Sequence, residues 1–136
     1  MRITIGRKEY FNAAHRLYNP EWSEEQNLAF YGKCANPNYH GHNYTLIVKL
    51  AGEVDPKTGY LVDLKKVSTV IREEITDRFD HTNLNLDNDD FKGLIPSTEN
   101  FAWVIWNRLR KKFDPKLELK IVLFETQNNF VEYNGE

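Results

Sequence analysis

Three histidines in this chain have the spacing of a metal site. His40 and His42 are two residues apart at the start of an apolar run. In a strand, residues i and i+2 point to the same face, about 6.5–7 Å apart, so two imidazoles can converge on one ion. His15 is the best candidate for the third ligand, because it is in phase with the core face of a neighbouring predicted strand. Three neutral nitrogens and one open position would form a catalytic zinc site. The alternative is three unrelated histidines of the surface or the core.

The only cysteine, Cys34, lies just before the histidine pair and can be interpreted in three ways. It could be a fourth zinc ligand that closes a structural site, or a thiolate base or nucleophile beside the metal. It could also be an inert buried thiol, which is common for cysteine. Its position in a loop, directly after Gly32 and Lys33, favours the reactive interpretation over the inert one.

Asp80 and His81 are a candidate pair for proton transfer. In a turn, both side chains could reach one cavity, where an aspartate that orients a histidine facing a thiol forms a relay. The alternative is a polar turn that ends a helix.

Glu125 is in phase with the apolar face of a predicted strand, where a carboxylate is costly unless it is paired. Its two oxygens suit the parallel donors of a cyclic guanidine-like edge, such as that of a pterin. The alternative is a strand-end glutamate turned to solvent. Thr98 and Glu99 lie at the start of a predicted helix and could add a hydroxyl and the helix N-terminus to the site of Glu125. The alternative is that these residues only cap the helix.

Apolar periodicity predicts the elements that position these residues. Residues 2–14 form a strand that places His15 in phase with its core face. Residues 42–53 form the next strand, and the Pro-Gly turn at 55–59 predicts a hairpin over 42–62. The remaining predicted elements are a short helix capped by Ser23, a helix from Asp63 to about Arg78 with a stripe of Leu64, Val67, Ile71 and Ile75, a helix from Ser97 or Thr98 to about Lys112, and strands 117–125 and 130–133.

The predicted order is β-β-α-α-β-β. It indicates an α+β fold, a four-stranded antiparallel sheet with both helices on one face, in a single domain over residues 1–136. Long uncovered edge strands invite pairing with another chain. We therefore expect an oligomer whose sheets join edge to edge.

Composition excludes several classes of protein. The chain has 136 residues, 28% of them charged, with a net charge of −2, so no general nucleic-acid or membrane surface is expected. A single cysteine cannot form an internal disulfide. The N-terminal residues carry charge too early for a signal peptide, and no apolar run is long enough to span a bilayer. The expected location is the cytoplasm.

Several segments, taken together and in order, resemble the family of 6-pyruvoyl- and 6-carboxy-tetrahydropterin synthases. The resemblance covers essentially the whole chain. The matching segments are residues 11–17 (FNAAHRL), 32–44 (GKCANPNYHGHNY), 52–56 (GEVDP), 79–84 (FDHTNL), 97–100 (STEN) and 124–126 (FET).

The resemblance implies the tunnelling fold, built from trimers that pair into hexamers with active sites between subunits. The site residues that it implies are zinc ligands His15, His40 and His42, a proton-transfer set of Cys34, Asp80 and His81, a pterin anchor at Glu125, and pocket residues Thr98 and Glu99.

The implied activity is that of a zinc lyase that converts 7,8-dihydroneopterin triphosphate to 6-pyruvoyl-tetrahydropterin and eliminates triphosphate, as in tetrahydrobiopterin synthesis. Five residues separate Cys34 from His40, which favours this product. The alternative is the 6-carboxy product of queuosine synthesis, whose formation also releases acetaldehyde. An alternative of a different class is a non-enzymatic zinc module in which Cys34 closes the shell.

Overall fold

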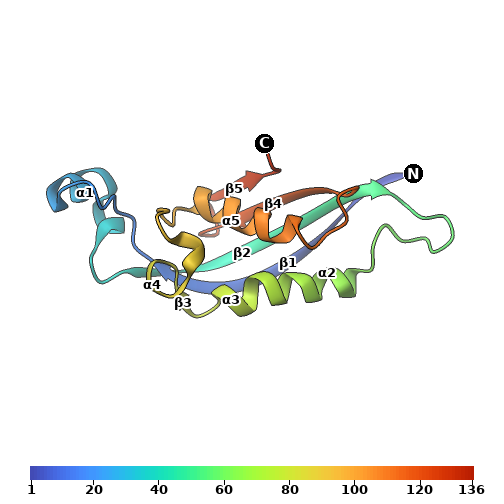
Figure 1. The fold of residues 1–136 in the computed structure, drawn as a ribbon, viewed down its shortest axis with the longest axis horizontal. Helices are drawn as coiled ribbons and strands as arrows, with labels where there is room; N and C mark the ends of the chain where they lie inside the picture. The colour runs from blue at the N-terminus through green and yellow to red at the C-terminus, as the bar shows by residue number, and fades with distance from the viewer.

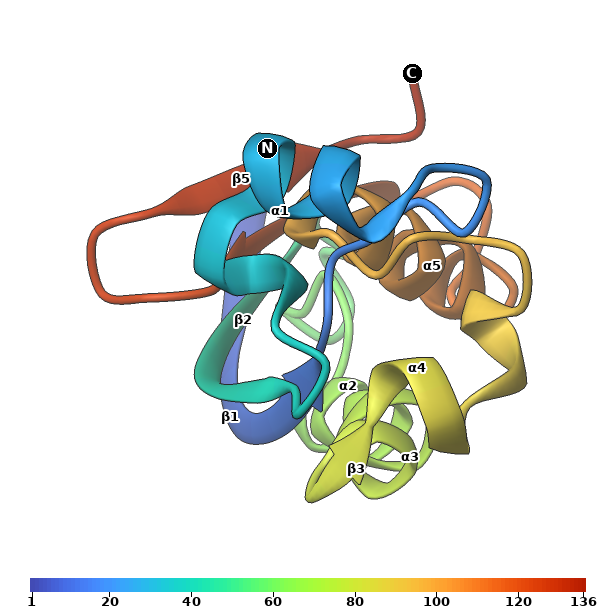
Figure 2. The same cartoon turned by 90° about the vertical axis from the view of Figure 1, so that its left-hand side faces the viewer.

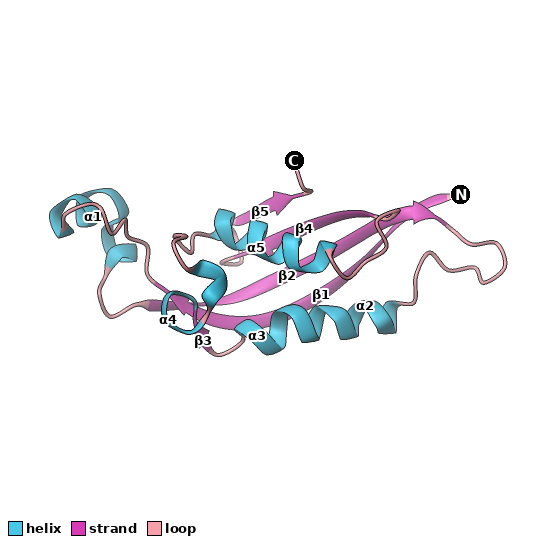
Figure 3. Ribbon diagram, in the orientation of Figure 1, coloured by secondary structure: helices cyan, strands magenta, loops and turns pink.

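A computed structural model describes residues 1–136 and contains one five-stranded sheet with the order β3-β1-β2-β4-β5. Helices cover one face of the sheet, and α1 projects beyond its end (Figure 1). The strands, drawn in magenta in Figure 3, are β1 (Arg2–His15), β2 (His40–Glu53), β3 (Thr82–Asn83), β4 (Glu118–Phe124) and β5 (Phe130–Tyr133). The helices are α1 (Glu24–Tyr31), α2 (Leu64–Ile71), α3 (Asp77–Phe79), α4 (Leu84–Asp87) and α5 (Thr98–Arg110), with 3-10 turns at Gly32–Ala35 and Asp89–Phe91 and a π-helical segment at Arg72–Thr76.

The α+β class is confirmed, and the strand count requires a correction. The strands β1, β2, β4 and β5 pair antiparallel, as expected. The short strand β3 adds a fifth strand, which is parallel to β1 and pairs Thr82 with Ala13. A strand of two residues contains no alternation of apolar and polar positions, so periodicity does not reveal it. The helices α2 and α5 lie on the same side of β1 and β2, as expected (Figure 2).

The predicted hairpin over residues 42–62 is wrong. The partner of β2 is β1, in a register that runs from Arg2 opposite Glu53 to His15 opposite His40. The turn itself exists, because Asp55 N–H donates to the carbonyl of Tyr60 at 2.9 Å. No strand follows it, since β1 and β4 already occupy both edges of β2.

The helix predicted over 63–78 is continuous but contains a π-helical segment. Its buried residues recur every four positions, at Val67, Ile71, Ile75 and Phe79. In an α-helix of 3.6 residues per turn, each such step rotates the side chain by about 40° away from its predecessor. The wider π turn at Arg72–Thr76 compensates for this drift and keeps all four residues on the core.

Leu64 does not belong to the apolar stripe that the sequence predicts. It is the first residue of α2 and is 47% exposed, outside the cluster of core side chains. The capping predictions are confirmed, and at α2 the carboxylate of Asp63 accepts from the N–H of Lys65. Ser23 and Gln26 form a capping box at α1, and the hydroxyl of Ser97 accepts from the N–H of Asn100 at the start of α5.

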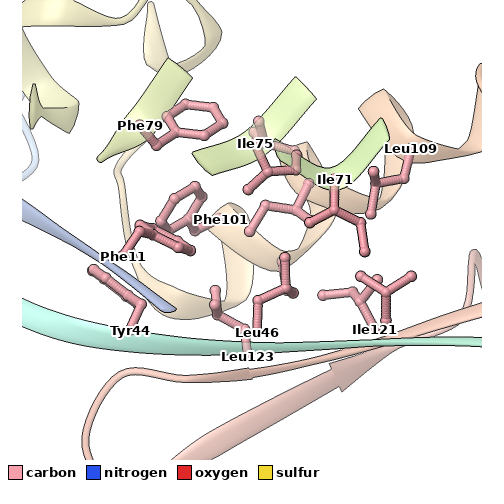
Figure 4. Close-up of a cluster of buried hydrophobic side chains, with 14 of the residues drawn as sticks. Phe11, Tyr44, Leu46, Ile71, Ile75, Phe79, Phe101, Leu109, Ile121 and Leu123 are labelled. Atoms are coloured by element: carbon pink, nitrogen blue, oxygen red, sulfur yellow. The ribbon is translucent and has the colours of Figure 1, made fainter. Parts of the chain in front are cut away.

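The core is one cluster of 21 buried residues between the sheet and the helices (Figure 4). Phe101 of α5 is fully buried, and its ring meets Phe11, Tyr44 and Phe79 edge to face. This packing fixes the start of α5 against the C-terminal end of β1 and the N-terminal end of β2, where the histidines lie. None of the helices has the length and apolar character needed to cross a bilayer.

Candidate metal centre

The structure brings the three predicted histidines together. The antiparallel register places His15 of β1 opposite His40 of β2, and His42 follows on the same face. One ring nitrogen of each lies within 4.8 Å of the others. The ring centroids are 4.6–5.0 Å apart, and His15 is fully buried. Three imidazoles at this separation can bind one ion.

A backbone carbonyl orients His15. Its Nδ1 lies 2.8 Å from the carbonyl oxygen of Pro96, the residue before the N-cap of α5. A carbonyl can only accept, so Nδ1 carries the proton and Nε2 presents its lone pair to the other two rings. This is the usual way in which a protein fixes the tautomer of a metal ligand.

The inward nitrogens are buried and unpaired. Nε2 of His15, Nε2 of His42 and both ring nitrogens of His40 have no hydrogen-bond partner. Buried polar groups are normally bonded, and three converging lone pairs suit a zinc ion, which prefers imidazole. Burial lowers the pKa of His15, outweighing the bond to Pro96, and burial followed by the charge of His42 lowers the pKa of His40. Both shifts favour the neutral rings that bind metal.

A carboxylate adjoins the histidines. Glu125 directly follows β4, and its Oε1 lies 3.1 Å from Nε2 of His42, without the geometry of a hydrogen bond. Its Oε2 accepts from the hydroxyl of Thr98, the first residue of α5. The structure thus brings Thr98 and Glu125 to the metal centre. Glu99 is exposed and makes no hydrogen bond or ion pair there.

Cys34 lies near the histidines along the chain but does not complete their shell. It is half-buried in the 3-10 turn, its side chain makes no hydrogen bond, and the group of converging ligand atoms does not include it. Its carbonyl accepts from the N–H of Leu17, two residues after His15. Three histidines therefore leave a fourth position that the sulfur does not fill in this chain.

Asp80 and His81 form a pair whose histidine is open to solvent. Nδ1 of His81 lies 2.9 Å from Oδ2 of Asp80, and Oδ1 accepts from the N–H of Asn12. The bond from Asn12, more than any other contact, lowers the pKa of Asp80. His81 has a φ of 61°, unusual for a residue other than glycine, and its side chain is 77% exposed. No hydrogen bond joins His81 to Cys34 within one chain.

Two groups at this site were not predicted from the sequence. The carbonyl of Pro96 gives no signal in the residue types, because any residue carries one. The second group is the hydroxyl of Tyr44, which is buried and has no partner. Tyr44 is two residues after His42 on the same strand, so the alternation that identified the histidine pair also places Tyr44 on their face.

Known proteins match the whole chain. The family model described as 6-pyruvoyl tetrahydropterin synthase matches residues 4–136. The human 6-pyruvoyl tetrahydrobiopterin synthase is 42% identical over 132 residues, which cover 97% of this chain and 91% of the human protein. The structure of Caenorhabditis elegans 6-pyruvoyl tetrahydropterin synthase is 37% identical, covers 100% of this chain and 97% of its own, and superposes with a TM-score of 0.94, which confirms the expected tunnelling fold.

A more distant relative has a different name. The dihydroneopterin monophosphate aldolase of Pyrococcus furiosus is 32% identical over 130 residues, which cover 96% of this chain and 95% of the aldolase. Overall similarity at this level therefore extends to proteins named for another pterin reaction. The family model and the human and nematode proteins nevertheless agree with the resemblance in the sequence, and this chain belongs to the 6-pyruvoyl tetrahydropterin synthase family.

Proposed function

We propose that residues 1–136 form a single domain that acts as a zinc-dependent lyase. It converts 7,8-dihydroneopterin triphosphate to 6-pyruvoyl-tetrahydropterin and eliminates triphosphate. The observation that carries the proposal is the set of three unpaired imidazole nitrogens with an open position, next to a carboxylate that can hold the ring. Membership of the family and the names of its close relatives support the choice of substrate and product.

His15, His40 and His42 would hold the zinc ion, and the lone pair that Pro96 directs inward supports this role. When bound, zinc supplies a Lewis acid beside the substrate side chain. The residues around it position the substrate. Glu125 accepts the two parallel donors of the pterin edge, and the hydroxyl of Thr98 steadies the carboxylate.

Proton transfer falls to Cys34 and to the pair of Asp80 and His81. In our proposal the thiolate of Cys34 removes a proton from the substrate side chain, and His81, oriented by Asp80, relays protons as triphosphate leaves. Tautomerisation moves hydrogen from the side chain to the ring, so the side chain is oxidised to the pyruvoyl group as the ring is reduced, with no external redox cofactor. The bond from Asn12 keeps Asp80 ionised, so it orients the His81 ring through Nδ1. Glu99 contributes to the pterin pocket in this proposal, although it is exposed in the single chain.

The position of His81 supports an assembly in which active sites lie between subunits. His81 is largely exposed and makes no hydrogen bond to Cys34 in its own chain. A neighbouring subunit would bring the two together and cover the exposed imidazole. We propose a hexamer of two trimers, in the cytoplasm. Its native mass and its solution scattering profile would test the assembly directly.

A pair of alanine variants tests the function against a structural zinc module. The enzyme proposal predicts that Cys34→Ala keeps one zinc per chain and its melting temperature, and loses turnover by at least about a hundredfold. A closed structural shell predicts the loss of both zinc and fold, because such metal binding is coupled to folding. His40→Ala should lose zinc in either case and serves as the control for the zinc assay.

A product assay distinguishes the two reactions that share these residues. The purified chain is incubated with 7,8-dihydroneopterin triphosphate, and both triphosphate and acetaldehyde are measured. Triphosphate without acetaldehyde is the expected result. The spacing of five residues between Cys34 and His40 favours that result. Acetaldehyde in the product mixture would replace the pyruvoyl reaction with the 6-carboxy reaction.

A further inference from the structure

One polar group at the edge of the core has no partner. Tyr44 is 1% exposed, and its hydroxyl makes no hydrogen bond. The ring is held on three sides. It stacks on Phe11 at 5.2 Å and meets Phe101 and His42 edge to face at 5.3 and 5.9 Å between centroids. Figure 4 shows Tyr44 at one end of the core cluster. A phenylalanine would fill this space equally well, so packing does not explain the hydroxyl.

Tyr44 contacts a residue that adjoins Glu125, because its ring meets His42, whose Nε2 lies 3.1 Å from Oε1 of Glu125. The register that pairs Thr45 with Phe124 places Tyr44 opposite Glu125 on the neighbouring strand. Phe101, which Tyr44 contacts, lies three residues after Thr98 on the same face of α5. A tyrosine hydroxyl can donate one hydrogen bond.

Glu125 needs such a donor. A carboxylate that accepts both donors of a pterin edge still has one free lone pair on each oxygen. Thr98 donates to Oε2. His42 is the neighbour of Oε1, but its Nε2 cannot donate a proton while it serves as a metal ligand. The Tyr44 hydroxyl, which has no partner, is a donor on the same face of the sheet.

We propose that Tyr44 is a positioning residue for the pterin site. When Glu125 binds the ring, its Oε1 accepts from the Tyr44 hydroxyl, which has no partner in the free chain, and this bond together with that of Thr98 holds the carboxylate in place. This inference rests on the proposed function, because it requires that Glu125 binds a pterin. Tyr44 acts through Glu125 and does not contact the reacting side chain.

Tyr44→Phe is the test, because it removes one oxygen and keeps the ring that packs on Phe11 and Phe101. We expect KM for 7,8-dihydroneopterin triphosphate and Kd for unsubstituted pterin each to rise about tenfold, the effect of losing a hydrogen bond to a charged group. Since this interaction binds substrate and transition state alike, kcat should stay within about twofold. Zinc content should stay the same, and the melting temperature should stay the same or rise.

The matched control is Tyr133→Phe, which removes the hydroxyl of a tyrosine packed on Trp106, on another part of the sheet. It should change neither KM nor Kd. Unchanged KM and Kd in Tyr44→Phe would overturn the inference and leave the hydroxyl an inert core group. A fall in kcat at constant KM would also overturn it, in favour of a role in the chemical step. A wild-type chain that binds no pterin would instead overturn the proposed function itself.

Discussion

Acidification should destabilise the metal-free protein in a narrow pH window. Burial lowers the pKa of His15 and His40 in the folded state, whereas in the unfolded chain both titrate near 6.5. Below pH 6.5 the unfolded chain therefore binds more protons than the folded chain. Stability then falls as the pH decreases from 6.5 toward the folded-state pKa values, and it is independent of these two groups above 6.5.

The slope follows from the number of protons. One histidine that is protonated only in the unfolded state changes the free energy of unfolding by about 1.4 kcal/mol per pH unit. His15 is fully buried and contributes this amount. His40 is partly exposed, and solvent screening reduces its share, so the expected slope is about 1.4–2.7 kcal/mol per pH unit. Asp80 and Glu132 have lowered pKa values and titrate below this window.

The assay is urea unfolding at fixed protein concentration, in the presence of a chelator, at pH values from 8 to 5.5. The variant His40→Gln, which lacks one of the two groups, should retain the smaller slope of His15 alone. Added zinc should raise stability at pH 7.5 and lose this effect on acidification, because the ligands must be neutral. A free energy of unfolding that is constant, or that rises, between pH 6.5 and 5.5 would refute the reasoning.

Two further variants test contacts described above. Thr98→Val removes the hydroxyl that donates to Glu125 and should weaken pterin binding by about 1.5–3 kcal/mol, measured by titration of the fluorescence of pterin, with zinc content unchanged. Gly135→Ala places a methyl group 2.5 Å from the Trp106 ring at a φ of 98°, so thermal unfolding should show a loss of about 1–3 kcal/mol. A melting temperature equal to that of the wild type would show that the C-terminal segment moves away from Trp106 without loss of stability.

Local signals in the sequence predicted much of the fold. The alternation in the second half of β1 and in β2, the capping box at Ser23 and the cap at Ser97 depend on residues within a few positions of one another, and the structure confirms each. The first half of β1 is largely exposed, and Ile3 does not lie in the core. The errors concern long-range choices. The turn at 55–59 was identified correctly, but the partner of β2 depends on which strands compete for its edges. The π-helical segment was also missed, although the spacing of four residues between Val67, Ile71, Ile75 and Phe79 is present in the sequence.

The same distinction applies to the candidate site. His15, His40 and His42 converge because strand phase and one antiparallel register place them on one face, and phase can be read from a single sequence. The pair of Asp80 and His81 follows α3, where a residue with positive φ turns the chain, and no periodic pattern extends through it. No hydrogen bond joins this pair to Cys34 within one chain, and in our proposal another copy brings them together.

Dilution of the protein can separate the requirements for zinc binding and for turnover. The histidine centre is complete within one chain, so an isolated subunit that keeps its fold should still bind zinc. In our proposal, Cys34 and His81 meet only across an interface. Dilution that separates the subunits should therefore abolish turnover before it releases the metal. Loss of zinc and of turnover at the same protein concentration would instead show that the assembly is needed to form the histidine centre itself.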